Sequence, residues 1–222
     1  MKATRTISIS TQAEIDAAPW DDPAAHIFVA YTTEPITLDL PQRNTARLDI
    51  SDEAKVDEIK GHTRVDHIGG NAKVNIISGS AYVDAIYWEA HVNVIEGCAH
   101  VGEINGASIV IISEEAHINL ILGESKVMLL GGFAKVDMIY ENTWVSSIHG
   151  SAFVTAILGS VQVDKIGEHA RVSGIGESAR VDWIGDNAYV VDFYDDAYVV
   201  EIDGDQTKLI GVGPATPPEK EN

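Results

Sequence analysis

The sequence predicts an all-β protein built as a parallel β-solenoid, and the main reason is a nine-residue repeat. The pattern A-x-V-x-x-I-x-G-x recurs from Ala54 to about Asp205, with one shortened step between Val101 and Ile109. β-Branched residues at fixed spacing among polar ones are typical of short strands. A nine-residue period fits neither the α-helix nor the heptad, so helical repeats are excluded.

The second observation is that three of the nine positions accept almost only small or aliphatic residues. A single copy cannot bury these side chains, but stacked copies can bury them against one another. We therefore expect the small, Val and Ile positions to point inward and to stack on their own kind, with roughly 4.8 Å between strands. The crossover rule for parallel strands predicts a right-handed solenoid.

The third observation is a superperiod that indicates how many copies form one coil. Gly follows the Ile by two positions in most copies. About every third copy replaces this Gly, at Trp88, Glu114, Glu141, Glu168 and Asp195. This favours three copies per coil, a three-sided helix with about 27 residues per turn and roughly 27 Å long. Residues 27 apart would then share one face, among them Arg64, His91, Trp144 and Arg171. The alternative is a coil of two copies and 18 residues.

The repeat divides the chain into three segments. Residues 1–53 do not repeat and are expected to form an N-terminal capping segment, with strands in "RTISIS", "HIFVAY" and "ITLDL". A short helix is expected between the first two strands, with Ser10 or Thr11 as its N-cap. Such a cap would cover the open edge of the first coil. Residues 54–213 form the solenoid, which ends in the strand "TKLIGVG", and the polar, Pro-rich residues 214–222 are expected to be disordered.

Charge indicates what kind of partner the protein has. The chain holds 34 acidic and 15 basic residues, a net charge of −19. This argues against direct binding to nucleic acid or to membranes and favours a basic protein surface. The N-terminus lacks the apolar core of a signal peptide, and Cys98 is the single cysteine, so we expect a cytoplasmic location.

The strongest candidate site is an acidic run near the C-terminus. Between Asp182 and Asp205 there is no Lys or Arg, and aromatic residues alternate with the carboxylates. Exposed carboxylates with aromatic neighbours suit a basic cleft, since charge steers the encounter and aromatic rings supply binding energy. The alternative is an acidic surface that only keeps the protein soluble. The predicted partner-binding residues are Asp182, Asp186, Tyr189, Asp192, Tyr194, Asp195, Asp196, Tyr198, Glu201, Asp203 and Asp205.

A second candidate surface lies in the middle of the chain, where apolar residues occupy positions that are polar in other copies. These residues either pack under a corner of the coil or form the seam of a homodimer. They are Val110, Ile111, Leu120, Leu122, Met128 and Leu129, with Met138 nearby.

No motif for catalysis or cofactor binding is present. The chain lacks a P-loop, a dinucleotide fingerprint, a nucleophile elbow and Cys or His spacings typical of metal sites. A 27-residue coil would stack His91 on His117, which we interpret as a surface ladder without a metal. We therefore expect a protein that is not an enzyme and that carries no cofactor and no metal.

The "AxVxxIxG" array behind a strand-helix-strand leader resembles uncharacterised nonapeptide-repeat β-helix proteins of actinobacterial genomes and prophages. Its architecture is also similar to that of pentapeptide-repeat β-helices, some of which mimic DNA and inhibit enzymes that bind it. The resemblance implies an acidic, non-catalytic DNA mimic that blocks a nucleic-acid-binding protein, such as a host nuclease, topoisomerase or defence complex. The alternative function is a self-associating structural building block.

Overall fold

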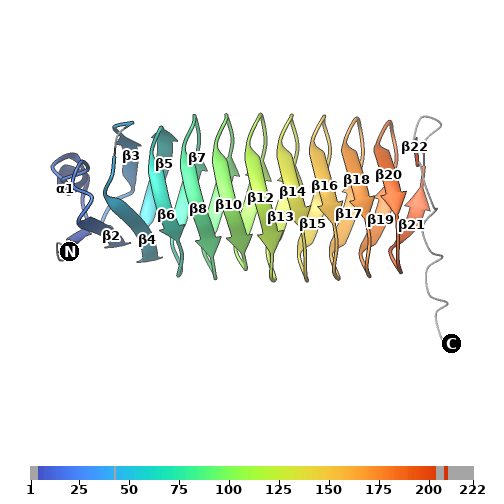
Figure 1. Ribbon diagram of the computed structural model, residues 1–222, viewed down its shortest axis with the longest axis horizontal. Coiled ribbons are helices and arrows are strands. Elements are labelled where there is room, and N and C mark those ends of the chain that lie inside the picture. Colours follow the sequence, from blue (N-terminus) through green and yellow to red (C-terminus); the bar gives the residue numbers. More distant parts are fainter. Residues whose placement is uncertain (1–4, 43, 204–207, 210–222) are drawn as a thin grey trace.

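The computed structural model describes residues 5–42, 44–203 and 208–209, and it is an elongated parallel β-solenoid (Figure 1). After the first strand, successive strands alternate between two parallel sheets, here called sheet A and sheet B. Sheet A has twelve strands: β1 (Arg5–Ile9), β2 (Ala25–Tyr31), β4 (Arg47–Glu53), β6 (Arg64–Ile68), β8 (Tyr82–Tyr87), β10 (His100–Asn105), β12 (His117–Leu122), β14 (Lys135–Ile139), β16 (Phe153–Ile157), β18 (Arg171–Ile175), β20 (Tyr189–Phe193) and β22 (Lys208–Leu209). Sheet B has ten: β3 (Ile36–Leu40), β5 (Lys55–Gly61), β7 (Lys73–Ile77), β9 (His91–Ile95), β11 (Ser108–Ile112), β13 (Lys126–Leu130), β15 (Trp144–Ile148), β17 (Gln162–Ile166), β19 (Arg180–Ile184) and β21 (Tyr198–Ile202).

Each coil contains two copies of the repeat, so the expected three-sided coil of 27 residues is wrong. Val74 pairs with Val92, which is 18 residues later, and the shortened step pairs Val92 with Ile109. The four residues expected on one face lie on both: Arg64 and Arg171 belong to sheet A, whereas His91 and Trp144 belong to sheet B. Twelve stacked strands span roughly 50 Å, about twice the expected length.

The superperiod gave the wrong coil size because it reflects which residues occupy the corners. It does not reflect how many residues form one coil. The position two residues after the Ile has a positive φ in Gly copies and non-Gly copies alike, for example 66° at Gly97 and 55° at Glu114. This left-handed conformation costs an L-residue about 1–2 kcal/mol, which explains the preference for Gly. The side chain of Glu114 offsets part of that cost, since Oε2 accepts the N–H of Gly97 in the preceding coil at 3.0 Å. Glu141 and Glu168 accept the N–H groups of Gly123 and Gly150 in the same way.

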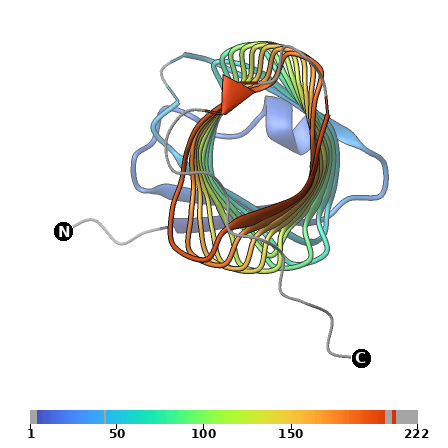
Figure 2. The same cartoon turned by 90° about the vertical axis from the view of Figure 1, so that its right-hand side faces the viewer.

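The core lies between the two sheets and consists of the three inward columns predicted from the repeat. The small, Val and Ile residues of the described copies are buried almost throughout; Val92 and Ile95, for example, are fully buried. Phe193, which replaces Ile in its copy, is also buried, as the sequence predicted. Stacking of like side chains gives every rung the same cross-section, so the rungs superpose along the axis (Figure 2).

The leader extends the solenoid and then closes its N-terminal end. Strands β2, β3 and β4 pair in parallel with the neighbouring rungs, so the leader continues the same two sheets. Helix α1 (Gln12–Asp16) has Thr11 as its N-cap and a capping box with Glu14. Figure 2 shows this helix at the far, N-terminal end of the tube. The side chains of Ile15 and Trp20 are buried in the core there.

Strand β4 is an element that sequence reading missed. Its residues Leu48 and Ile50 are fully buried, and Ile50 pairs with Ile68 of the regular repeat. Within the described ranges, no helix is long and apolar enough to cross a lipid bilayer. Asp205, most of the expected strand "TKLIGVG" and residues 214–222 lie outside the described residues.

Candidate interaction surface

The predicted acidic surface begins on β19, winds once around the end of the described solenoid and does not lie on one face. Asp192 belongs to β20 in sheet A, and Asp195 and Asp196 follow at the corner after that strand. Glu201 belongs to β21 in sheet B, on the other side of the core, and Asp203 follows at the next corner. Tyr189 and Tyr198 are likewise divided between sheet A and sheet B. The carboxylates therefore form two groups. One lies on sheet A and at the corner after β20, and the other lies on sheet B and at the corner after β21.

The sheet A group is organised around the ring of Tyr194, which is 42% exposed. A Cβ added to Gly176 would stand only 1.9 Å from this ring, and one added to Gly174 would stand 3.0 Å from it. These two glycines are therefore the floor on which the ring lies, a role that sequence reading missed. Burial, followed by the carboxylates of Asp195, Glu177 and Asp192, raises the pKa of the Tyr194 phenol, so the hydroxyl stays available as a donor.

Several of the predicted binding carboxylates already have partners within the protein, among them Asp182, Asp186 and Asp195. Asp182 forms an ion pair with Arg180, which lies just before the acidic run. Asp186 accepts the backbone N–H of Glu168 at 3.2 Å. Asp195 accepts the N–H of Glu177 at 3.3 Å. The acidic run holds no Lys or Arg of its own, but Arg180 and the two backbone contacts make these three carboxylates partly structural.

The expected dimer seam is divided between the two sheets. Val110, Ile111, Met128 and Leu129 lie on sheet B, whereas Leu120 and Leu122 lie on sheet A. Met128 is 46% exposed and Met138 is 37% exposed, so these two side chains do not pack under a corner. On sheet B the register adds two residues that sequence reading missed. The resulting sheet B stripe of paired, half-buried side chains is Ile76, Val94, Ile111 and Leu129.

The histidine ladder also differs from the expected one. His91 and His117 lie on different sheets, and His117 instead has His100 as its neighbour. The His100 ring stacks on Tyr82 with centroids 5.0 Å apart and an interplanar angle of 9°, and it meets the edge of His117 at 5.0 Å. Burial first, and then the neighbouring His117, lowers the pKa of His100.

This lowered pKa predicts a loss of stability in mild acid. The unfolded chain takes up a proton on His100 near its ordinary pKa of about 6.5, while the folded protein resists protonation until a lower pH. The free energy of unfolding should therefore fall as the pH drops through about 6.5 and into that window. Urea titrations between pH 8 and pH 5 would measure this slope, and His100→Gln should reduce it. An unchanged slope in His100→Gln would contradict the assignment.

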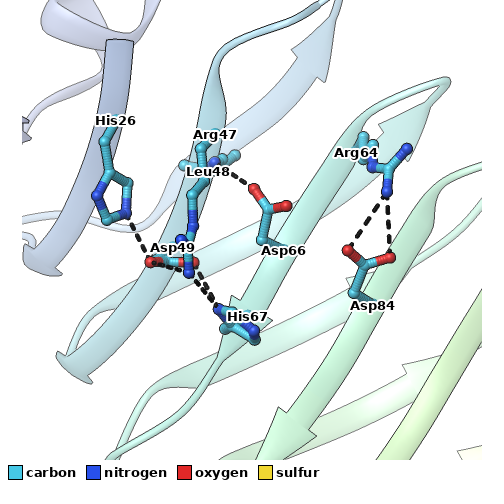
Figure 3. A network of polar contacts seen from close by, with 8 residues as sticks. All are labelled: His26, Arg47, Leu48, Asp49, Arg64, Asp66, His67 and Asp84. Carbon is cyan, nitrogen blue, oxygen red and sulfur yellow. Dashed lines mark hydrogen bonds and ion pairs between the residues drawn. The ribbon is translucent and has the colours of Figure 1, made fainter. Parts of the chain in front are cut away.

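A polar network that the sequence did not predict lies on sheet A near the N-terminal end (Figure 3). The carboxylate of Asp49 contacts His26 Nε2 at 2.6 Å and His67 Nδ1 at 2.9 Å, and Arg47 Nη2 lies 3.6 Å away. Asp66 accepts the backbone N–H of Leu48 at 2.8 Å. His26 and Asp49 belong to the non-repeating leader, so their register relative to His67 could be known only from the fold.

Cys98 is the single cysteine of the chain, and its thiol contacts the carboxylate of Glu115. Hydrogen bonding to Glu115, together with the Glu115 charge, raises the pKa of the Cys98 thiol, so it stays protonated at neutral pH. No group of three or more His, Cys, Asp or Glu side chains placed to hold a metal ion is found in the described part of the chain. Comparisons with protein-family models, with curated proteins and with solved structures gave no match.

Proposed function

We propose that the protein is a non-catalytic acidic binder that occupies the nucleic-acid site of a basic protein, as a DNA mimic does. The observation that carries the proposal is the density of carboxylates on β19, β20, β21 and the corners after them. They fall within little more than one coil, roughly 6 Å of solenoid axis. B-DNA carries about three or four charges over that length. The carboxylates are Asp182, Asp186, Asp192, Asp195, Asp196, Glu201 and Asp203.

Shape and stiffness support the same function. In a tube of stacked rungs, carboxylates at the same corner of successive coils are roughly 4.8 Å apart. The scaffold that carries them is rigid. Such a surface loses little conformational entropy when it enters a cleft, because its side chains stand on a rigid scaffold. The exposed ring of Tyr194 adds apolar area beside the carboxylates. A phage-type inhibitor of a nuclease, topoisomerase or defence complex would use these properties.

The test removes charge from the acidic surface without disturbing the fold. The variant changes Asp192, Asp195 and Asp196 to Asn and Glu201 to Gln. Asn at position 195 keeps an acceptor for the Glu177 N–H and tolerates the positive φ of 57°. The matched control removes four exposed carboxylates from the rest of the molecule: Asp21, Glu34, Glu115 and Glu124.

Each immobilised protein is incubated with a bacterial lysate at about 50 mM salt, and bound proteins are released with duplex DNA. We expect the immobilised wild type and the control variant to capture a nucleic-acid-binding protein from the lysate. The acidic-surface variant should bind it about 100-fold more weakly, and binding should fall steeply towards 200 mM salt. Equal loss in both variants would mean that only bulk charge matters, and no loss in either would overturn the proposal.

A second candidate function, self-association as a structural building block, is favoured by the exposed apolar groups of the middle coils. The sheet B stripe lies beside Met128, and Phe133 is 66% exposed at a nearby corner. Association through this surface would be insensitive to salt, unlike an electrostatic complex. Sedimentation of the wild type and of an Ile111, Met128 and Leu129 triple Ser variant, all on sheet B, would separate the two functions. A salt-resistant dimer lost in the triple variant would favour assembly.

A further inference from the structure

A surface pocket of about 400 Å³ opens at the corners that follow β4, β6 and β8, far from the acidic C-terminal coils. Gly69 and Gly70 form its floor, because these residues have no side chains. The neighbouring coils have large or charged side chains at the same corner. Tyr87 and Trp88 of the next coil stand on one side, and Asp52 of the previous coil stands on the other. The pocket exists because two adjacent glycines interrupt the column of corner side chains.

Trp88 is the unusual residue of this pocket. Its φ is 56°, and every other non-Gly residue with a positive φ in the described chain is Asp or Glu. A bulky aromatic residue in this conformation is an outlier, and such outliers concentrate at functional sites. The side chain gains little burial in return, because it is 68% exposed. It lies over the pocket floor, where a Cβ on Gly69 would stand 3.0 Å from its ring.

The lining is aromatic and negatively charged. Phe28, Tyr87 and Trp88 contribute rings, and Asp49 and Asp52 contribute carboxylates, while none of the described lining residues is Lys or Arg. The rings of Tyr87 and Trp88 have centroids 6.0 Å apart and planes inclined at 48°. Burial, followed by the nearby carboxylates Glu103 and Asp84, raises the pKa of the Tyr87 phenol, which is consistent with a negative local potential.

Three other outward aromatic rings, those of Tyr82, Trp183 and Tyr189, lie against cations of the protein itself. The Arg64 guanidinium lies 5.1 Å from the centroid of Tyr82, and the Lys165 ammonium lies 4.4 Å from that of Trp183. In the part of the chain that the structure describes, Trp88 has no such cation. In addition, the hydroxyl of Ser51, which also lines the pocket, is buried without a hydrogen-bond partner. The pocket thus has an open aromatic face and the carboxylate of Asp52, while the carboxylate of Asp49 already contacts His26, His67 and Arg47.

We propose that this pocket binds a guanidinium group, the end of an arginine side chain of the basic partner. A planar guanidinium can stack on the Trp88 ring while its N–H groups reach Asp52, and Arg is the cation most often found on Trp. The identity of the arginine as a partner's side chain rests on the proposed function. The binding of a guanidinium itself does not, so it can be tested without a partner.

The test titrates N-acetylarginine amide into the ¹⁵N-labelled full chain at constant ionic strength and follows the Trp88 indole N–H signal. The neutral isostere N-acetylcitrulline amide and N-acetyllysine amide are the comparison ligands. We expect saturable shifts at Trp88 with the arginine derivative, at least fivefold weaker binding of the lysine derivative, and no saturation with citrulline. Equal binding of either comparison ligand, or no shift at Trp88, would overturn the proposal.

Trp88→Gly is the matched variant, because Gly is the residue that most other copies have at this corner. Its melting temperature should not fall, since the substitution relieves an unfavourable φ. Arginine binding, followed through the Gly70 amide, should weaken about tenfold. Phe133→Ser removes an equally exposed ring at another corner and should leave binding unchanged. Unchanged binding in a folded Trp88→Gly protein would contradict the role of the ring.

Failure of this inference and failure of the proposed function give different results. If arginine binds at Trp88 but removal of the C-terminal charges leaves partner capture unchanged, only the proposed function fails. If those charges control partner capture but the arginine derivative does not shift the Trp88 signal, only the pocket assignment fails. Both are supported if the acidic-surface variant loses the partner and still binds the arginine derivative.

Discussion

Replacing Val92 with Asp is expected to unfold the protein. Val92 is fully buried in sheet B, and the residues that pair with it in the coils on either side are Val74 and Ile109. A carboxylate at this position would have neither water nor a basic partner, which costs several kcal/mol, a large share of the stability of a typical domain. Circular dichroism and size-exclusion chromatography would report the loss of the β signal and of the monodisperse species.

Thr155→Asp is the control for this prediction. It adds the same charge to an exposed strand position beside the buried Val154, and it should leave the melting temperature nearly unchanged. A folded, monodisperse Val92→Asp protein with a cooperative transition would show that the Val column is not an all-aliphatic interior. Loss of folding in both variants would point to net charge and not to burial.

Trp20→Ala is expected to destabilise the N-terminal end by about 3–5 kcal/mol. Trp20 belongs to the leader; its side chain is only 8% exposed, and its indole N–H donates to the carbonyl oxygen of Ile15 at 2.9 Å. The truncation would leave a cavity under α1 and remove the hydrogen bond that holds the end of the helix. It would also expose the first rung, whose open edge can pair with another chain.

The damage should stay local, because each rung of a solenoid contacts mainly its neighbours. Hydrogen exchange should accelerate in β1 to β4 while β14 to β18 keep their protection. The control is Trp183→Ala, which removes an outward ring that contacts Lys165 and should cost about 1 kcal/mol or less. Uniform loss of protection along the whole chain would show that the destabilisation is not local. An unchanged melting temperature would contradict the role of Trp20 in stabilising the N-terminal end.

The candidate surface was only partly predictable from the sequence. The acidic run could be recognised because counting charged residues along the chain requires no knowledge of the fold. Its division between sheet A and sheet B, and the bonds from Asp186 and Asp195 to the preceding coil, depend on register. The pocket beside Trp88 could be suspected only from a bulky residue in a glycine column. Its partners Phe28 and Asp49 belong to the leader, where no repeat indicates the alignment.

The sequence by itself determined the solenoid class, the parallel strands and the three inward columns, because these follow from side-chain volume and β-branching within nine residues. It also determined the helix near Thr11, since a capping box is a local interaction. Only the tertiary structure decided that two copies close a coil. Closure depends on how sharply each left-handed corner turns the chain and on the distance at which two sheets fill the space between them. That geometry is shared by Gly97 and Glu114 alike, so their difference in sequence marks a hydrogen bond between coils and not the length of a turn.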